Sequence, residues 1–213
     1  MGSIKAQSES GPDMPPRRPA GTEADLSDAE ICTALGDGAH WAADALYDRV
    51  VDAVEAVLFR VLGADADRDD LTQQAIERVV SSVVSGRFAR GCSLRSWATL
   101  LAQHVAVDAL RARARERKLF DRRIPYQTLE LVEAHTATPE HLAEMRRRVT
   151  LLQSALGRVN RQRSEAVVLH DLLGHDLPEL ARLTGVSVAA AQSRLVRGRR
   201  DILAWIRAHE GTE

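Results

Sequence analysis

The chain has 213 residues, a mass of 23.4 kDa, 45% apolar and 28% charged residues, and a formal net charge of −1. This size allows one or two domains and excludes a large multidomain enzyme. Two cysteines are too few for a disulfide framework, and no apolar run suggests a membrane span or secretory signal, so we expect a cytoplasmic protein without membrane insertion. Catalytic and nucleotide-binding motifs are absent from the sequence, which therefore predicts no enzyme, metal or cofactor.

The small net charge hides segments of opposite sign. Residues 1–85 hold 7 basic and 16 acidic side chains, whereas 86–123 hold 10 basic and 3 acidic ones, and 145–200 hold 11 arginines. A single charged run is typical of a solvated helix face. Two separate basic segments favour a protein that meets a polyanion at two points, and the acidic segment indicates a second, basic protein partner.

The N-terminal segment and the first helix are predicted from local signals. Residues 1–25 are rich in proline, glycine and acidic side chains, which predicts a disordered tail. A helical first domain is expected over 26–118. Its first helix is short, because Ser27 and Glu30 have the spacing of a capping box and Gly36 interrupts the apolar pattern soon afterwards.

Three longer amphipathic helices complete the predicted first domain. Apolar residues recur at steps of three and four over 39–62, where Gly63 ends the pattern, and again over 71–83. A third helix contains Trp97 and runs into the arginine-rich segment 111–118; its apolar half should pack and its distal half should lie in solvent. Trp97 is in register with the apolar face, which favours a core position over a stacking platform for bases.

Residues 119–141 contain the helix breakers Pro125 and Pro139 and predict a flexible linker to a second domain over 142–209. The helices of that domain are expected at 149–159, 166–173, 178–183 and 188–206. No strand pattern is found in the sequence. The predicted fold class is therefore all-α, with two small helical domains.

The last two predicted helices have the spacing of a helix-turn-helix, in which Ala181 permits close helix crossing and Gly185 supplies the turn. The second helix of this motif enters the major groove of DNA. The base-reading candidates are Ser187, Val188, Ala191, Gln192 and Arg194, and the phosphate-contacting candidates are Arg197, Arg199 and Arg200. An ordinary helical corner is the alternative interpretation.

A second nucleic-acid signal is the basic, glycine-bracketed loop G-R-F-A-R-G-C-S-L-R-S-W, which begins at Gly86. Basic, polar and aromatic side chains on a loop suit single-stranded or unstacked nucleic acid. Cys92 lies in this loop, and a packing role is favoured over redox control because the sequence offers it no evident partner.

Several stretches in this order resemble the extracytoplasmic-function (ECF) sigma factors, the two-domain minimal class of bacterial transcription initiation factors. They are A-L-Y-D-R at 45–49, D-D-L-T-Q-Q at 69–74, S-L-R-S-W at 93–97, V-D-A-L-R at 107–111 and S-R-L-V-R-G-R at 193–199. The resemblance covers about residues 38–207. It implies a region 2-like first domain, a region 4-like second domain, and a protein that directs core RNA polymerase to promoters and stabilises promoter opening.

The resemblance also implies partners and contact residues. Core RNA polymerase, through its β and β′ subunits, would be bound by Asp69, Asp70, Gln73, Gln74 and Glu77. The melted non-template strand of the −10 element would be contacted by Arg87, Arg90, Ser93, Arg95, Ser96, His104, Asp108 and Arg111. The second domain would read the −35 element as duplex DNA, and an anti-sigma factor would cover the polymerase-binding surfaces. For Asp70, a helix-capping role is the alternative.

This sequence departs from the family pattern at two places. Gln103 and His104 stand where Arg-Asn is usual, and Ile76 and Val80 stand where aromatic residues are usual.

The alternative functions are a helix-turn-helix regulator that acts without polymerase and a sigma-like protein that has lost initiation. Binding to core polymerase discriminates these alternatives from a sigma factor. A purely structural module would leave both basic segments unexplained.

Overall fold

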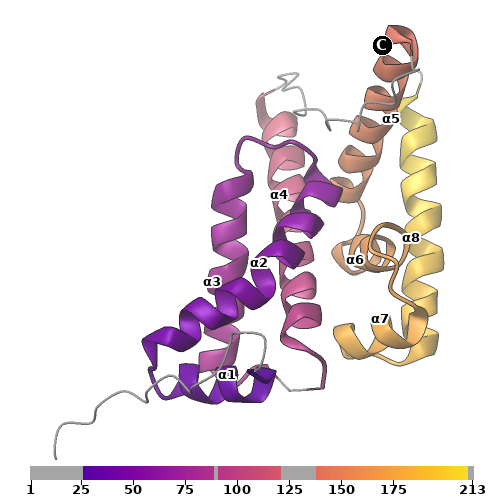
Figure 1. Cartoon of the computed structure of the whole chain (residues 1–213). Helices are drawn as coiled ribbons and strands as arrows, with labels where there is room; N and C mark the ends of the chain where they lie inside the picture. The colour runs from indigo at the N-terminus through magenta and orange to yellow at the C-terminus, as the bar shows by residue number, and fades with distance from the viewer. Residues whose placement is uncertain (1–25, 89–90, 121–137, 211–213) are drawn as a thin grey trace, which may run out of the picture.

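The structure is a computed structural model that describes residues 26–88, 91–120 and 138–210 (Figure 1). Every element in these ranges is helical, which confirms the predicted all-α class. The tail predicted over 1–25 and most of the predicted linker lie outside the described residues.

The first group of helices is α1 Asp28–Gly36, α2 His40–Leu62, α3 Arg68–Val84 and α4 Leu94–Phe120. α2 packs against α3 and α4, and α1 crosses one end of the group (Figure 1). The core between them is aliphatic: Leu46, Val54, Leu58, Leu94 and Leu110 are all fully buried. The helix boundaries predicted from the apolar pattern are confirmed to within a few residues.

Local signals explain where α1 and α2 begin and end. The Ser27 hydroxyl accepts from the Glu30 N–H, and a Glu30 carboxylate oxygen lies 2.8 Å from the Ser27 nitrogen, so the predicted capping box is present. Gly63 ends α2 with a φ of 79°, in the left-handed region that favours glycine. Asp28 fastens α1 to its neighbours, because its carboxylate accepts from Arg49 of α2 and from the Leu94 N–H at the start of α4.

The second group consists of α5 Pro139–Arg158, α6 Arg161–Val167, a π-helical turn η2 Val168–Leu172, α7 Leu177–Thr184 and α8 Val188–His209. Thr138 caps α5 by accepting from the His141 N–H. Pro139, predicted as a breaker within the linker, is instead the first residue of α5, a position where the missing proline N–H costs nothing.

The two groups pack against each other. α4 contacts α2 and α3 on one side and α5 and α6 on the other, and it lies between them in Figure 1. One continuous set of buried residues runs from Ile31 in α1 to Ile202 in α8. The described helices therefore form a closed arrangement with a shared apolar core.

The distal half of α4 was expected in solvent, and the structure corrects this. Arg113 donates hydrogen bonds to Asp65 and Asp67 in the connection between α2 and α3, and Ala114 is only 4% exposed. Burial lowers the pKa of Arg113, but the hydrogen bonds and charges of Asp65 and Asp67 together outweigh it, and the net shift is upward. The arginine-rich segment thus contributes to folding as well as to surface charge.

Candidate nucleic-acid interface

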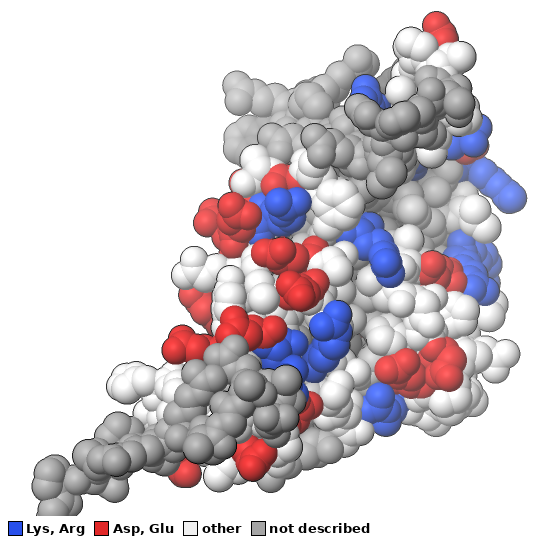
Figure 2. Space-filling view, in the orientation of Figure 1, with Lys and Arg blue, Asp and Glu red and all other residues white. Residues whose placement is uncertain are grey.

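The five residues predicted to bind core polymerase form one exposed acidic and polar face of α3. Asp69, Asp70, Gln73, Gln74 and Glu77 are all exposed and recur at steps of three and four, which puts them on one side of the helix. Acidic side chains gather on the α2–α3 side of the molecule in Figure 2.

A groove of ≈ 750 Å³ runs beside this face, between α2 and α3. Its apolar lining includes Tyr47 and Val84, which are 47% and 58% exposed, and the two family departures Ile76 and Val80. The acidic rim of this α2–α3 groove is formed by Glu55, Asp69 and Glu77. An apolar floor with an acidic rim suits a partner helix that carries both apolar and basic side chains.

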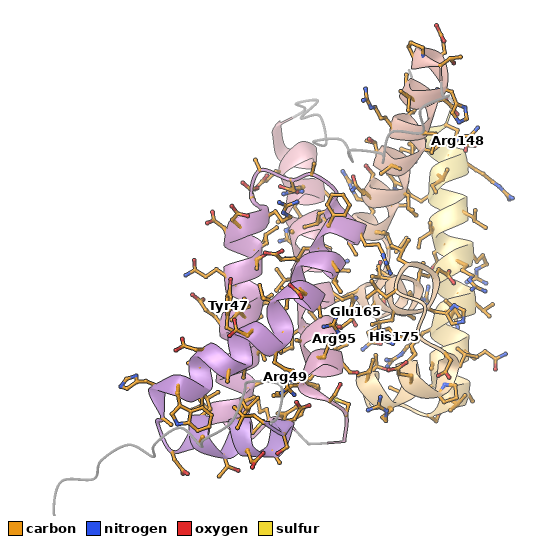
Figure 3. All side chains as sticks on the ribbon, viewed as in Figure 1. Tyr47, Arg49, Arg95, Arg148, Glu165 and His175 are labelled. Carbon is orange, nitrogen blue, oxygen red and sulfur yellow. The ribbon has the colours of Figure 1, made fainter. Side chains whose placement is uncertain are left out.

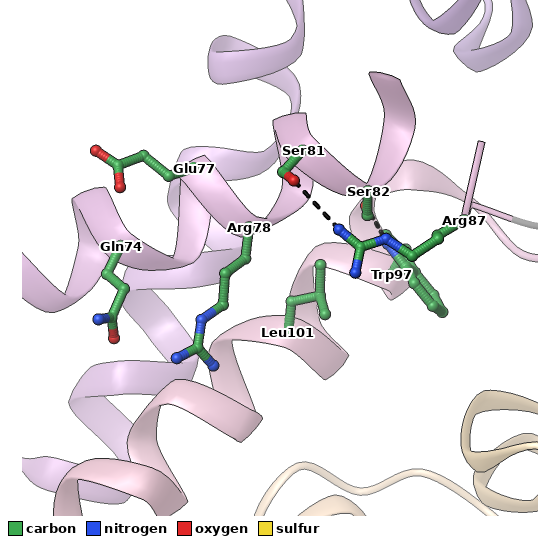
Figure 4. A pocket seen from close by; sticks show the side chains of 8 residues that line it. All are labelled: Gln74, Glu77, Arg78, Ser81, Ser82, Arg87, Trp97 and Leu101. Carbon is green, nitrogen blue, oxygen red and sulfur yellow. Dashed lines mark hydrogen bonds between the residues drawn. The ribbon is translucent and has the colours of Figure 1, made fainter. Parts of the chain in front are cut away.

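A second hollow of ≈ 530 Å³ lies between α3 and α4, next to the basic loop (Figure 4). This α3–α4 pocket is lined by Gln74, Glu77, Arg78, Ser81, Ser82, Arg87, Trp97 and Leu101. The Arg87 guanidinium donates to the hydroxyls of Ser81 and Ser85, and the Trp97 indole donates to Ser82 at 2.8 Å. Two guanidinium groups beside an indole can accommodate an unstacked base and its phosphate.

The loop residues divide into exposed and structural ones. Arg87 and Arg95 are exposed, and Arg90 lies outside the described residues. Ser93 caps α4 by accepting from the Ser96 N–H at 3.1 Å, so this pair defines the start of the helix.

Aromatic packing anchors the same loop. Phe88 is 8% exposed, and its ring lies 6.0 Å from the Trp97 ring. Trp97 is partly buried: it packs against the apolar core, and it also lines the α3–α4 pocket. The choice between a core role and a base-stacking role therefore stays open.

Three of the residues predicted to contact the −10 element face the second group of helices instead. His104 Nε2 lies 3.6 Å from a Glu165 carboxylate oxygen, and the Asp108 carboxylate lies 3.2 Å from Arg161. Glu165 projects at the junction of the two groups in Figure 3. Burial lowers the pKa of His104 despite the nearby Glu165 carboxylate, so the imidazole is favoured in its neutral form.

Arg111 completes this row on α4. Its guanidinium donates to the Val159 carbonyl oxygen at 2.8 Å, and it is half-buried. In this arrangement His104 and Arg111 contact α6 and the residue just after α5, and Asp108 lies between Arg161 of α6 and Arg78 of α3. Contact of these three residues with the −10 strand stays a prediction.

The helix-turn-helix has the predicted geometry. Gly185 has a φ of 67°, and Ala181, at the predicted helix crossing, is only 4% exposed. The Ser187 hydroxyl caps α8 by accepting from the Ala190 N–H at 3.2 Å. A helical corner of this kind can present the first turns of α8 to a DNA groove.

The base-reading candidates on α8 are not equally accessible. Val188 and Gln192 are exposed and Arg194 is half-buried, but Ala191 is 0% exposed because it faces the packed side of α8. The buried position of Ala191 does not favour a contact with bases, and the base-reading roles of the other candidates stay predictions. The sequence analysis missed Val196, an apolar residue of α8 that is 57% exposed.

The phosphate-contacting candidates on α8, Arg197, Arg199 and Arg200, are all exposed. The Arg199 Nε donates to the Asp171 carboxylate at 2.9 Å. The hydrogen bond from Arg199 lowers the pKa of Asp171.

One residue that the sequence analysis did not single out connects the two candidate DNA-binding elements. Arg182, in the first helix of the helix-turn-helix, donates to the carbonyl oxygen of Gly91 in the basic loop at 2.7 Å. The sequence places these residues 91 positions apart, and no local pattern relates them.

Both groups of helices match known family models. Residues 46–116 match Sigma-70 region 2, and residues 150–202 match Sigma-70, region 4. These matches define the chain as an RNA polymerase sigma factor with DNA-binding helices. Among the described residues, none of the helices combines the length and apolar character that crossing a membrane requires.

Similarity to characterised relatives narrows the class. The chain is 32% identical over 168 residues to the sigma factor CarQ of Myxococcus xanthus, covering 76% of this chain and 87% of CarQ. It is 27% identical over 191 residues to the ECF sigma factor SigC of Mycobacterium tuberculosis, and this match covers 85% of this chain and 94% of SigC. The match to the ECF sigma factor SigE of Mycolicibacterium smegmatis is 28% identical over 166 residues and spans 78% of this chain but only 62% of SigE. The chain belongs to the ECF RNA polymerase sigma factors.

The solved structures matched by the chain include CnrH in complex with the cytosolic domain of CnrY, with a TM-score of 0.48, 20% identity, and coverage of 86% of this chain and 99% of that one. Another is the sigma factor RpoE in complex with the anti-sigma factor NepR from Bartonella quintana, with a TM-score of 0.45 and 17% identity. This match covers 76% of this chain and 94% of that one.

Proposed function

We propose that this protein binds core RNA polymerase in the cytoplasm, directs it to promoters by reading −35 and −10 elements, and stabilises the opened strands. It catalyses no covalent reaction, because the polymerase performs the chemistry. The observation that carries the proposal is that one chain matches both the region 2 and the region 4 models and bears an acidic face on α3 apart from a basic helix-turn-helix.

Core polymerase docks on the acidic face of α3 and in the adjacent α2–α3 groove. The exposed residues Asp69, Asp70, Gln73, Gln74 and Glu77 support this assignment. The apolar groove supplies area to bury, and the acidic rim selects a basic partner. An anti-sigma factor that inhibits the protein would compete for the same surface.

The −10 strand binds at the basic loop and the α3–α4 pocket. Arg87 and Arg95 are exposed there, and the pocket combines Trp97 with the guanidinium of Arg78. Duplex DNA of the −35 element binds the first turns of α8, where Val188 and Gln192 face outward. Exposed arginines further along α8 contact phosphates, which makes binding dependent on salt.

Two substitutions on separate surfaces test this division. Asp70→Ala should weaken binding to purified core polymerase and spare binding of the second domain to −35 duplex DNA. Arg194→Ala should do the opposite. The matched controls are Asp44→Ala, an exposed acidic residue of α2, and Arg207→Ala, an exposed arginine at the far end of α8, and each should behave as wild type.

The proposal fails if Asp70→Ala and Arg194→Ala show equal defects in both assays, because the two surfaces would then not act separately. Binding to −35 duplex DNA without any binding to core polymerase would identify a helix-turn-helix regulator instead.

A further inference from the structure

We propose that residues 14–19 of this chain dock in the α2–α3 groove and cover it in the free protein, where they compete with core polymerase for the same surface. The competition rests on the proposed function, whereas the docking itself needs no polymerase. Residues 14–19 lie outside the described residues, and their sequence, the groove and the place where the described chain begins together carry the proposal.

The first observation is the exposed apolar floor of the groove. Tyr47 of α2 and Val84 of α3 are exposed there, and Ile76 and Val80 also line the groove. Ile76 and Val80 stand where the resemblance leads us to expect aromatic residues, and their smaller side chains leave room in the floor. A groove of ≈ 750 Å³ is large enough to take up several side chains of an extended peptide.

The second observation is the negative charge around this floor. Glu55, Asp69 and Glu77 are exposed and line the groove. Asp48 is also exposed, and it lies seven residues before Glu55, on the same side of α2. Acidic side chains gather on this side of the molecule in Figure 2. The groove therefore favours an occupant that carries positive and no negative charge.

The third observation is the sequence of the segment, which reads M-P-P-R-R-P at residues 14–19. It combines two arginines with four apolar residues and has no acidic side chain. Its prolines favour the polyproline II conformation, which loses little entropy on binding and is recognised by apolar grooves with aromatic side chains.

The segment also matches the groove in length. Six residues of polyproline II span about 19 Å at ~3.1 Å per residue. The groove-lining residues of α3 run from Asp69 to Val84, about 22 Å along the helix at ~1.5 Å per residue. The segment can therefore lie along most of the groove.

The fourth observation is that the chain can reach the groove. The described residues begin at Leu26, whose carbonyl oxygen accepts from Arg49 of α2 at 2.6 Å. Tyr47 lies two residues before Arg49 and projects on the α3 side of the same helix (Figure 3). The chain from Arg18 to Leu26 can span about 28 Å at ~3.5 Å per residue, more than twice the ~10–12 Å diameter of a helix with its side chains.

This tether favours the chain's own segment over a separate partner. A short tether holds a ligand near its site at an effective concentration on the order of millimolar. A contact that is too weak to persist between two molecules is therefore well populated within one chain. Docking in the groove also lowers the apparent affinity of any other partner, because only the uncovered fraction of the protein can bind it.

Photo-cross-linking in the full-length protein tests the docking. Tyr47→benzoylphenylalanine keeps an aromatic side chain in the groove, and irradiation followed by mass spectrometry should give cross-links to residues 14–19 of the same chain. Val196→benzoylphenylalanine, at an exposed position of α8, is the matched control and should give no such cross-link. Absence of these cross-links from position 47, or equal yields from both positions, would overturn the docking.

Mixing isotopically light and heavy protein identifies the occupant. Cross-links that join a light and a heavy chain would show that a second copy fills the groove, and would overturn docking within one chain. The proposal predicts that light chains are linked only to themselves, at a yield independent of protein concentration.

A charge reversal tests the role of the two arginines. Arg17→Glu together with Arg18→Glu should reduce the yield of cross-links from position 47 several-fold, because carboxylates would face the acidic rim. Lys5→Glu changes a basic residue outside the proline-rich segment and should leave the yield unchanged. Equal yields in the two variants would contradict charge-dependent docking.

Binding to purified core polymerase tests whether the segment covers the groove. The variant with Arg17→Glu and Arg18→Glu should bind core polymerase several-fold more tightly than wild type, and Lys5→Glu should match wild type. Equal affinities of all three proteins would overturn the competition. A protein that gives the predicted cross-links but binds no core polymerase would instead refute the proposed function, so the two failures are distinguishable.

Discussion

The Trp97 indole of α4 donates a 2.8 Å hydrogen bond to the Ser82 hydroxyl of α3, and that hydroxyl in turn donates to the Val79 carbonyl oxygen. The pair joins two helices at the floor of the α3–α4 pocket (Figure 4). The pocket therefore depends on a buried polar contact as well as on its apolar lining.

Removal of this contact should destabilise the protein. Trp97→Phe and Ser82→Ala should each lower the free energy of unfolding, and a double-mutant cycle should give a coupling of about 1 kcal/mol. Urea unfolding followed by circular dichroism measures both quantities. Trp205→Phe is the control, because Trp205 is half-buried near the end of α8. It should lower the free energy of unfolding by less than Trp97→Phe does. A coupling near zero would contradict the assigned hydrogen bond.

Arg113 should be far more important for stability than its neighbour on the same helix. Arg113→Ala leaves Asp65, whose side chain is 6% exposed, without its cation, and should cost about 3–5 kcal/mol. Arg115 is exposed, and Arg115→Ala should change stability by no more than about 0.5 kcal/mol. Thermal and urea unfolding of the two variants compare them directly, and equal losses would contradict a structural role for the Arg113–Asp65 pair.

Two buried glutamines should respond in opposite directions to the same substitution. The Gln103 amide is fully buried and has no hydrogen-bond partner among the described residues, so Gln103→Leu should raise the free energy of unfolding by about 1–3 kcal/mol. Gln153 makes two hydrogen bonds, and Gln153→Leu should lower the free energy of unfolding by leaving two carbonyl groups unpaired. A loss of stability in both variants would show that Gln103 has a partner.

Stability should fall below neutral pH because of His104. Burial lowers the pKa of His104 below the ordinary value of 6.5. The positive charges of Arg161 and Arg78 lower this pKa further, and the negative charges of Glu165 and Asp108 only partly oppose the shift. The unfolded chain therefore takes up this proton at a higher pH than the folded chain does. As the pH falls through 6.5, the wild type should lose stability relative to His104→Asn. Equal pH slopes, or a wild type that gains stability, would contradict the lowered pKa.

Local structure could be predicted where adjacent residues determine it. The capping box of Ser27 with Glu30 and the glycine that ends α2 both follow from short-range hydrogen bonds and backbone conformation, and both are confirmed. The helix-turn-helix was predicted for the same reason, since Ala181 and Gly185 act within one turn.

Long-range packing could not be predicted in this way. The pairing of Arg113 with Asp65 joins residues 48 positions apart. Gly157 of α5 lies so close to α4 that a Cβ there would stand 2.6 Å from the Leu110 carbonyl oxygen, and no local pattern indicates this approach. Ala191 was expected to read bases because of its place in α8, but packing within the second group determines which side of that helix is buried. Charge patterns indicate which kinds of partner to expect, whereas the fold determines which side chains are accessible.

The most direct test of the central claim is run-off transcription by purified core RNA polymerase on a genomic promoter library, with and without this protein. A sigma factor should produce specific new transcripts that share an upstream and a −10 motif, and Asp70→Ala should reduce them. Core polymerase that gives the same transcripts in both reactions, with no binding of this protein to the core enzyme, would contradict the account.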